Sequence, residues 1–234
     1  MRKKGFVCFC LFLFLSTFLI GGTANAALFN LAGVNDNYNT ATVEFDYNFN
    51  ERRDLTDYGE VKISITNTGQ YDPVITGFGF NVPNEVYYIN GFSGPSGWFG
   101  VFHRNSISTP EQYGFFDVAG MTGASGLEGG NPQKGIPVDE TFDFNFKFKG
   151  PDFEGLNTDS FLSELSDIKH QGTPVPFLAR VQQTGLDGEG SDVMIHGEGD
   201  PASAPVPEPA TMMLFGTGLL ALAGFGRKKF FTGK

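Results

Sequence analysis

The chain has 234 residues, with 26 acidic and 16 basic side chains and a formal net charge of −10. Seven of the basic residues lie at the two chain ends, which leaves nine between them together with all 26 carboxylates. Because such an acidic body repels polyphosphate and anionic lipid, the charge argues against nucleic-acid binding and against adsorption to anionic membranes.

The cysteine content narrows the class further. Both cysteines, Cys8 and Cys10, lie in the apolar segment near the N-terminus. The rest of the chain therefore holds no disulfide, no thiolate zinc site and no catalytic cysteine. Aromatic residues make up 15% of the chain, which is typical of a folded domain and not of a disordered one.

Residues 1–26 predict a secretory signal peptide. A basic start at 2–4 is followed by the apolar stretch Phe6–Ile20 and by Ala24 and Ala26, the small residues of an A-x-A cleavage site. A permanent membrane anchor is the alternative, but the apolar run is short for a span. We expect signal peptidase to cut after Ala26 and the protein to leave the cytoplasm.

Residues 27–200 are predicted to form one extracytoplasmic domain of antiparallel strands. Apolar and polar residues alternate along several segments, most clearly over Thr141–Lys149, where four phenylalanines share one face and polar residues share the other. The other predicted strands are Thr42–Asn50, Glu60–Asn67, Val74–Val82, Glu85–Ile89, Trp98–Arg104, Tyr113–Val118, Phe177–Gln183 and Asp192–His196. This pattern favours a mainly β fold, an antiparallel β-sandwich of two packed sheets, immunoglobulin-like or jelly-roll-like.

Two segments of the body depart from the strand pattern. One short helix is expected from a cap at Thr158 or Asp159, because Phe161, Leu165 and Ile168 recur at helical spacing. The glycine-rich segment 120–137 has few large apolar residues and predicts a long exposed loop.

The search for catalytic chemistry yields no motif. His103, His170 and His196 are not spaced as ligands on one helix face, and packing or capping is the favoured interpretation of His103 and His170. No serine stands in the G-x-S-x-G pattern of a nucleophile elbow. The many carboxylates identify no particular glycosidase pair. We therefore expect a protein that is not an enzyme and has no cofactor.

Two weaker candidates for ligand binding remain. Asp187, Glu189 and Asp192, interleaved with glycines, suit a hard cation such as Ca²⁺, but an acidic turn between two strands is the favoured interpretation. Trp98, near Tyr87 and Tyr88, is a candidate for stacking on a sugar, and core packing is the favoured alternative.

The C-terminus carries a second export pattern. After a linker at 201–205, residues 206–229 contain Pro207, Glu208 and Pro209, then an apolar segment at 210–226, then a basic cluster. That cluster is Arg227, Lys228 and Lys229, and a short tail at 230–234 follows it. The apolar segment predicts a transmembrane helix with the basic cluster and the tail in the cytoplasm and the acidic body outside. An ordinary single-pass tail anchor would have the same hydropathy.

This ordered set of three parts resembles the PEP-CTERM sorting signal of Gram-negative bacteria. The resemblance implies recognition of Pro207, Glu208 and Pro209 by an exosortase, a membrane transpeptidase, with 210–226 as a transient span and Arg227–Lys229 as the stop. It also implies bacteria that make exopolysaccharide. The body is similar, more diffusely, to the sandwich-like region of secreted PEP-CTERM proteins at 61–69, 75–81, 142–149, 177–182 and 190–192.

These observations together predict a secreted protein of the cell surface or the exopolysaccharide matrix, linked to biofilm formation. Its expected partners are signal peptidase and exosortase during export, and exopolysaccharide afterwards. A carbohydrate-binding module is the first alternative, and a secreted hydrolase with an unidentified carboxylate site is the second.

Overall fold

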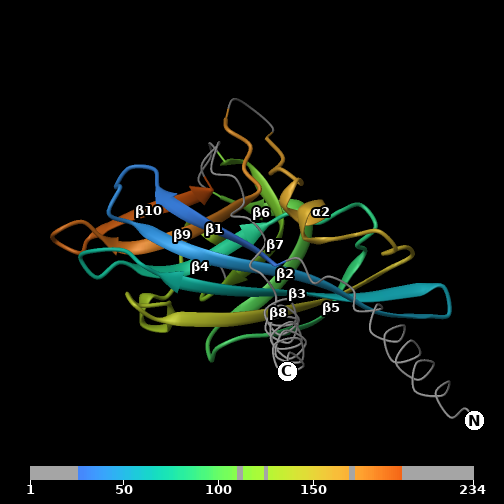
Figure 1. The fold of residues 1–234 in the computed structure, drawn as a ribbon. Helices are drawn as coiled ribbons and strands as arrows, with labels where there is room; N and C mark the ends of the chain where they lie inside the picture. Colours follow the sequence, from blue (N-terminus) through green and yellow to red (C-terminus); the bar gives the residue numbers. More distant parts are fainter. Residues whose placement is uncertain (1–25, 110–112, 124–125, 169–171, 197–234) are drawn as a thin grey trace, which may run out of the picture.

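The computed structural model describes residues 26–109, 113–123, 126–168 and 172–196, drawn in colour in Figure 1. Its strands are β1 (Ala27–Gly33), β2 (Thr40–Arg53), β3 (Thr56–Asn67), β4 (Val74–Phe80), β5 (Tyr88–Ser93), β6 (Phe99–Ser108), β7 (Phe115–Met121), β8 (Thr141–Gly150), β9 (Phe177–Thr184) and β10 (Gly190–His196). Its helices are α2 (Thr158–Leu162) and the 3₁₀ turns η2 (Gly126–Glu128) and η3 (Pro132–Lys134). The prediction of a mainly antiparallel β fold with one short α-helix is confirmed for these residues.

The strands form one continuous sheet, in the order β5-β8-β3-β2-β1-β10-β9-β4-β7-β6, with every neighbouring pair antiparallel. The expectation of two separate packed sheets was wrong. The reason is β1, which pairs with β2 on one side, Phe29 opposite Val43, and with β10 on the other, Gly33 opposite Met194. Backbone pairing therefore runs without a break from one half of the sheet into the other.

The sheet folds over and buries phenylalanine rings between its two halves. The ring centroids of Phe45 and Phe80 lie 5.3 Å apart, and those of Phe78 and Phe144 lie 4.8 Å apart. At the open side the two edge strands, β5 and β6, are in contact. The ring of Phe92 in β5 lies directly over Gly100 in β6 and leaves no room there for a Cβ atom. The alternating phenylalanines of β8 thus face a core that is nearly closed.

The segment 120–137 is not the long exposed loop that its composition predicts. Leu127 and Ile136 are fully buried, and Leu127 packs over Gly77 and Gly79 of β4, where an added Cβ would come within 2.9 and 2.7 Å of it. The glycines on the outer face of β4 therefore make the space that this apolar side chain fills. Leu127 and Ile136 thus anchor this segment to the body of the protein.

The β2–β3 hairpin is longer than the predicted strands and projects from one end of the molecule (Figure 1). Its tip, Asp54 and Leu55, has two left-handed residues with φ of 47° and 66°, as a tight hairpin turn requires. Below the tip, the fully buried Asp57 pairs with Arg52 and accepts a 2.6 Å hydrogen bond from the backbone N–H of Phe153. The α2 helix is also shorter than predicted, and Leu165 beyond it is half exposed.

Candidate functional sites

The residues predicted for sorting lie largely outside the described residues. Ala24, residues 207–209 and residues 227–229 belong to segments that the structure does not describe, as does the predicted membrane segment 210–226. Ala26 immediately precedes β1, which begins at Ala27. Across the described ranges, no helix combines the length and the apolar character needed to cross a bilayer.

Trp98 is a core residue. Its side chain is 6% exposed, its ring centroid lies 4.7 Å from that of Phe144, and its indole Nε1 donates a 2.7 Å hydrogen bond to the carbonyl oxygen of Lys134. This burial agrees with core packing, the favoured interpretation of Trp98, and argues against a sugar-stacking platform. Its sequence neighbours Tyr87, Tyr88 and Phe99 are the exposed aromatics in this region.

The three residues suggested for calcium are not brought together. Asp187 and Glu189 are exposed in the β9–β10 turn, whereas the carboxylate of Asp192 is buried and accepts hydrogen bonds from the loop after β1. Within the described part of the chain, no group of three or more His, Cys, Asp or Glu residues is arranged to hold a metal ion. Calcium binding at this turn stays a prediction without a preformed site.

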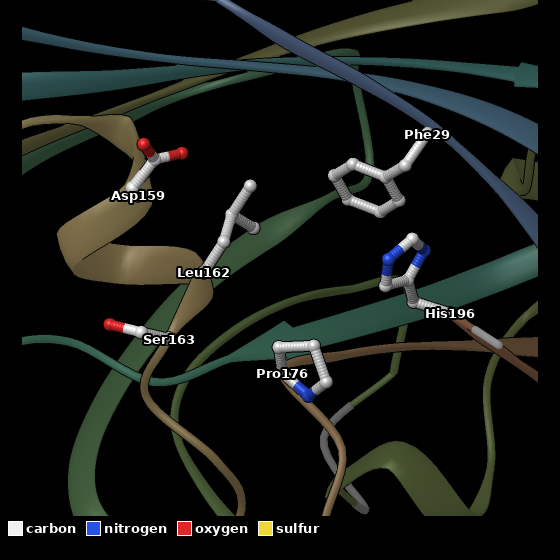
Figure 2. Close-up of a pocket in the computed structure, with 6 residues that line it drawn as sticks. All are labelled: Phe29, Asp159, Leu162, Ser163, Pro176 and His196. Atoms are coloured by element: carbon white, nitrogen blue, oxygen red, sulfur yellow. The ribbon is translucent and has the colours of Figure 1, made fainter. Parts of the chain in front are cut away.

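A pocket of about 250 Å³ lies between α2 and the end of β10. Figure 2 shows its lining: Phe29, Asp159, Leu162, Ser163, Pro176 and His196. The composition includes a serine, a histidine and an aspartate, but Ser163 Oγ donates to the carbonyl oxygen of Ser160, and His196 Nδ1 lies 3.4 Å from the carbonyl oxygen of Asn30. No hydrogen bond among the described residues links the three into a relay, and the His196 ring packs against Phe29 at 4.8 Å.

A second pocket, of about 400 Å³ and lined mostly by polar residues, lies beside the bulge in β6. The Asp117 carboxylate accepts hydrogen bonds there from the backbone N–H groups of Val82 (3.2 Å) and Asn105 (2.8 Å). Arg104 donates to backbone carbonyls in the loop after β4, among them that of Pro83. These side chains are occupied in fixing the bulge and the loop. Of the remaining predicted residues, His103 is exposed on β6, and His170 lies outside the described residues.

An exposed aromatic pair joins two loops at the opposite end of the molecule from the β2–β3 hairpin tip. Tyr38, between β1 and β2, and Tyr71, between β3 and β4, are 50% and 48% exposed. Their ring centroids lie 5.1 Å apart at an interplanar angle of 85°. Sequence inspection missed this pair, because 32 residues separate the two tyrosines and nothing in either loop forms a motif.

The backbone of both loops is fixed by hydrogen bonds. Asp192 accepts from the N–H groups of Asn35 and Asp36 and from the side chain of Asn39. The N–H of Gln70 donates to the carbonyl oxygen of Tyr38 at 2.9 Å, which ties one loop to the other. The two rings therefore sit on a preformed frame.

The comparisons with known proteins bear on the C-terminus. Residues 205–228 match the family model of the PEP-CTERM protein-sorting motif. The chain therefore carries this sorting motif, and the resemblance seen in the sequence is confirmed for that segment. Searches of curated proteins and of solved structures give no match.

Proposed function

We propose that the protein is a non-enzymatic component of the cell surface or of the extracellular matrix, delivered by an exosortase that processes its C-terminus. The observation that carries the proposal is the PEP-CTERM motif at residues 205–228, which implies export and a membrane-associated sorting step. The acidic body is the exported part, and the tail is removed or replaced during sorting.

The position of the first strand and the sequence of the tail support this proposal. Strand β1 starts at Ala27, one residue after the predicted cleavage position, so cleavage after Ala26 would leave the whole sheet intact. The basic residues 227–229 favour a cytoplasmic end for the tail, which places the body on the far side of the membrane.

A binding or structural role is supported over turnover by how the polar side chains are used. Ser163, Asp117 and Asp192 all bond to nearby backbone groups, so each serves local structure. A catalytic centre instead needs a nucleophile or acid–base pair aimed at a shared point in a cleft. Among the described residues, Ser163, His196 and Asp159 share a pocket without a hydrogen bond between them, and Asp117 lines a different pocket.

Intact-mass analysis of the protein from its native host tests the proposal. We expect a mature chain that starts at Ala27 and ends at one of residues 207–209. Replacement of 207–209 by three alanines is expected to retain Lys234 and to leave the protein in the membrane fraction. Pro201→Ala, which alters a proline outside the motif, is the matched control and should mature normally. A wild-type protein that retains Lys234 would contradict the proposal and indicate a permanent anchor.

A further inference from the structure

We propose that Tyr38 and Tyr71 form a binding site for a neutral polysaccharide. Both rings are about half exposed, and they meet nearly at right angles, so one ring face and one ring edge border the same corner of the surface. The proposal adds a ligand to the extracellular function proposed above. It rests on that function only in assuming that the protein is exported to where polysaccharide is present.

The backbone of the loop between β3 and β4 fixes the position of Tyr71 beside Tyr38. Gly69 is buried so tightly that an added Cβ would lie 2.5 Å from Pro73 Cγ and 3.3 Å from the carbonyl oxygen of Tyr38. Asn67 is 1% exposed, and its side chain donates to the carbonyl oxygens of Pro73 and Ile136 while accepting from Gly69 N. These bonds close the loop and hold Tyr71 against Tyr38.

The loop also stores strain at the aromatic position. Tyr71 and Asp72 have φ of 66° and 57°, two consecutive non-glycine residues in the left-handed region. That conformation is costly for residues with a side chain and persists where the surroundings impose it, often at binding sites. Placing the Tyr71 ring at this position therefore costs conformational free energy that a glycine would not incur.

The chemistry around the rings favours a sugar over a protein partner. A pyranose ring offers an apolar C–H face to an aromatic ring and hydroxyl groups to polar acceptors. The residues that flank the tyrosines are Asp36, Asn37, Gln70 and Asp72, all polar and at least partly exposed. A protein interface would need a much larger apolar area than two isolated rings provide.

Charge selects the class of polysaccharide. Two aspartates, Asp36 and Asp72, lie within two residues of the tyrosines along the chain, and the body as a whole is strongly acidic. Anionic polymers such as those built from uronic acids are repelled by such a surface. The geometry therefore points to a neutral hexose polymer.

The position of the pair suits an exposed binding surface. Strand β10 runs toward His196, and only residues 197–204 separate it from the sorting motif, a reach of at most about 28 Å. The loop with Tyr38 is bonded to Asp192, near the start of the same strand. A body tethered through its tail would thus carry the tyrosines at the end remote from the tether.

Affinity electrophoresis of the exported protein tests the proposal, with laminarin, dextran and galactomannan as neutral gels and alginate as the anionic one. We expect retardation in at least one neutral gel. Tyr38→Ala and Tyr71→Gly should weaken binding about tenfold, the scale of one stacking contact. Tyr71→Gly removes the ring but accepts the left-handed backbone, so it also guards against misfolding. Tyr38→Phe should bind like the wild type, and Tyr87→Ala, equally exposed elsewhere, is the matched control.

Three outcomes would overturn the proposal. These are no retardation by any neutral polymer, retardation by alginate alone, or equal retardation of the wild type and the two ring-deletion variants that keep a wild-type melting temperature. Polysaccharide binding is measured on purified protein, whereas sorting is measured from the intact mass of the protein from its host. A failure of the binding proposal is therefore distinguishable from a failure of the proposed sorting.

Discussion

Tyr47 buries a hydroxyl group for which the described residues supply no hydrogen-bond partner. Burial, and secondarily the charge of Asp57, raises the pKa of the Tyr47 phenol far above its ordinary value, so the group stays neutral. A buried polar group without a partner costs free energy that an apolar group of the same shape does not. We therefore expect Tyr47→Phe to raise the free energy of unfolding by about 1 kcal/mol in urea denaturation.

The control for Tyr47→Phe is Tyr88→Phe, which removes a hydroxyl from a ring that is 59% exposed. An exposed substitution of this kind changes stability by about 0.5 kcal/mol or less. A loss of stability in Tyr47→Phe would show that the hydroxyl has a favourable partner after all.

Asp57 makes the base of the β2–β3 hairpin sensitive to acid. The hydrogen bond from Arg52 lowers the pKa of the Asp57 carboxyl below its usual 3.8; burial opposes this, and the N–H of Phe153 reinforces it. A lowered pKa means that the folded state binds the proton less tightly than the unfolded one, so the stabilisation is complete above pH 3.8 and is lost as the pH falls through the folded-state value. We expect wild-type stability to fall in that acid range.

Urea denaturation of wild type and Asp57→Asn between neutral pH and pH 2 checks this prediction. The variant should be less stable at neutral pH, since a buried hydrogen-bonded pair is broken, and should show a shallower acid slope. Asp143→Asn, on the exposed face of β8, should keep the wild-type slope. Parallel slopes for wild type and Asp57→Asn would assign the acid sensitivity to other carboxyls.

At the scale of elements, Asp192 holds the β1–β2 loop. Its buried carboxylate accepts hydrogen bonds from Asn35 N, Asp36 N and Asn39 Nδ2 at 3.1–3.3 Å. Asp192→Ala would leave these donors unpaired, and we expect a loss of about 2–4 kcal/mol in stability. Hydrogen exchange should accelerate at residues 34–39 before it does elsewhere.

Asp187→Ala is the matched comparison for Asp192→Ala, because Asp187 is an exposed aspartate in the adjoining β9–β10 turn. It should alter stability by about 0.5 kcal/mol or less and leave exchange in the 34–39 loop unchanged. Equal losses of stability in the two variants would mean that the negative charge near the β9–β10 turn determines stability, and not the hydrogen bonds from Asp192 to the β1–β2 loop.

Strand alternation predicted most elements, and the exceptions have physical causes. Strand β8 begins at the predicted Thr141 and ends at Gly150, one residue beyond the prediction. The agreement is close because one face of the strand is apolar and the other is polar. Strand β1 went unpredicted, since its seven residues directly follow the signal-peptide segment and include small ones. The prediction at 85–89 overlaps β5 only at Tyr88 and Ile89, and a bulge between Ile89 and Gly91 interrupts the pairing of β5 with β8.

The candidate site shows the limit of such prediction. Residues 205–228 could be identified because their signal is local and ordered along the chain. Tyr38 and Tyr71 could not, because only the pairing of β2 with β3, Ala41 opposite Asn67, brings their loops together. For Trp98 the sequence favoured core packing but could not identify the packing partners, because Phe144 and Lys134 lie far along the chain.

At the scale of the whole molecule, the first and last strands meet in the middle of the sheet. Because β1 and β10 join the two halves, the half that contains β10 is incomplete, and the halves cannot pair with each other, until residues 190–196 are present. The sorting motif begins only nine residues after His196. The strand that joins the two halves is therefore the described strand nearest to the motif along the chain.

This architecture predicts an unequal response to proline. Met194 is fully buried in β10, paired with Gly33 on one side and Ala179 on the other, so Met194→Pro removes a ladder N–H at the junction of the two halves and clashes in a central strand. We expect loss of cooperative unfolding and rapid proteolysis. Asn90→Pro lies in the bulge of edge strand β5 and should cost about 1 kcal/mol or less. If Met194→Pro instead unfolds cooperatively near the wild-type midpoint, the halves are independent units and the β1–β10 pairing does not govern assembly.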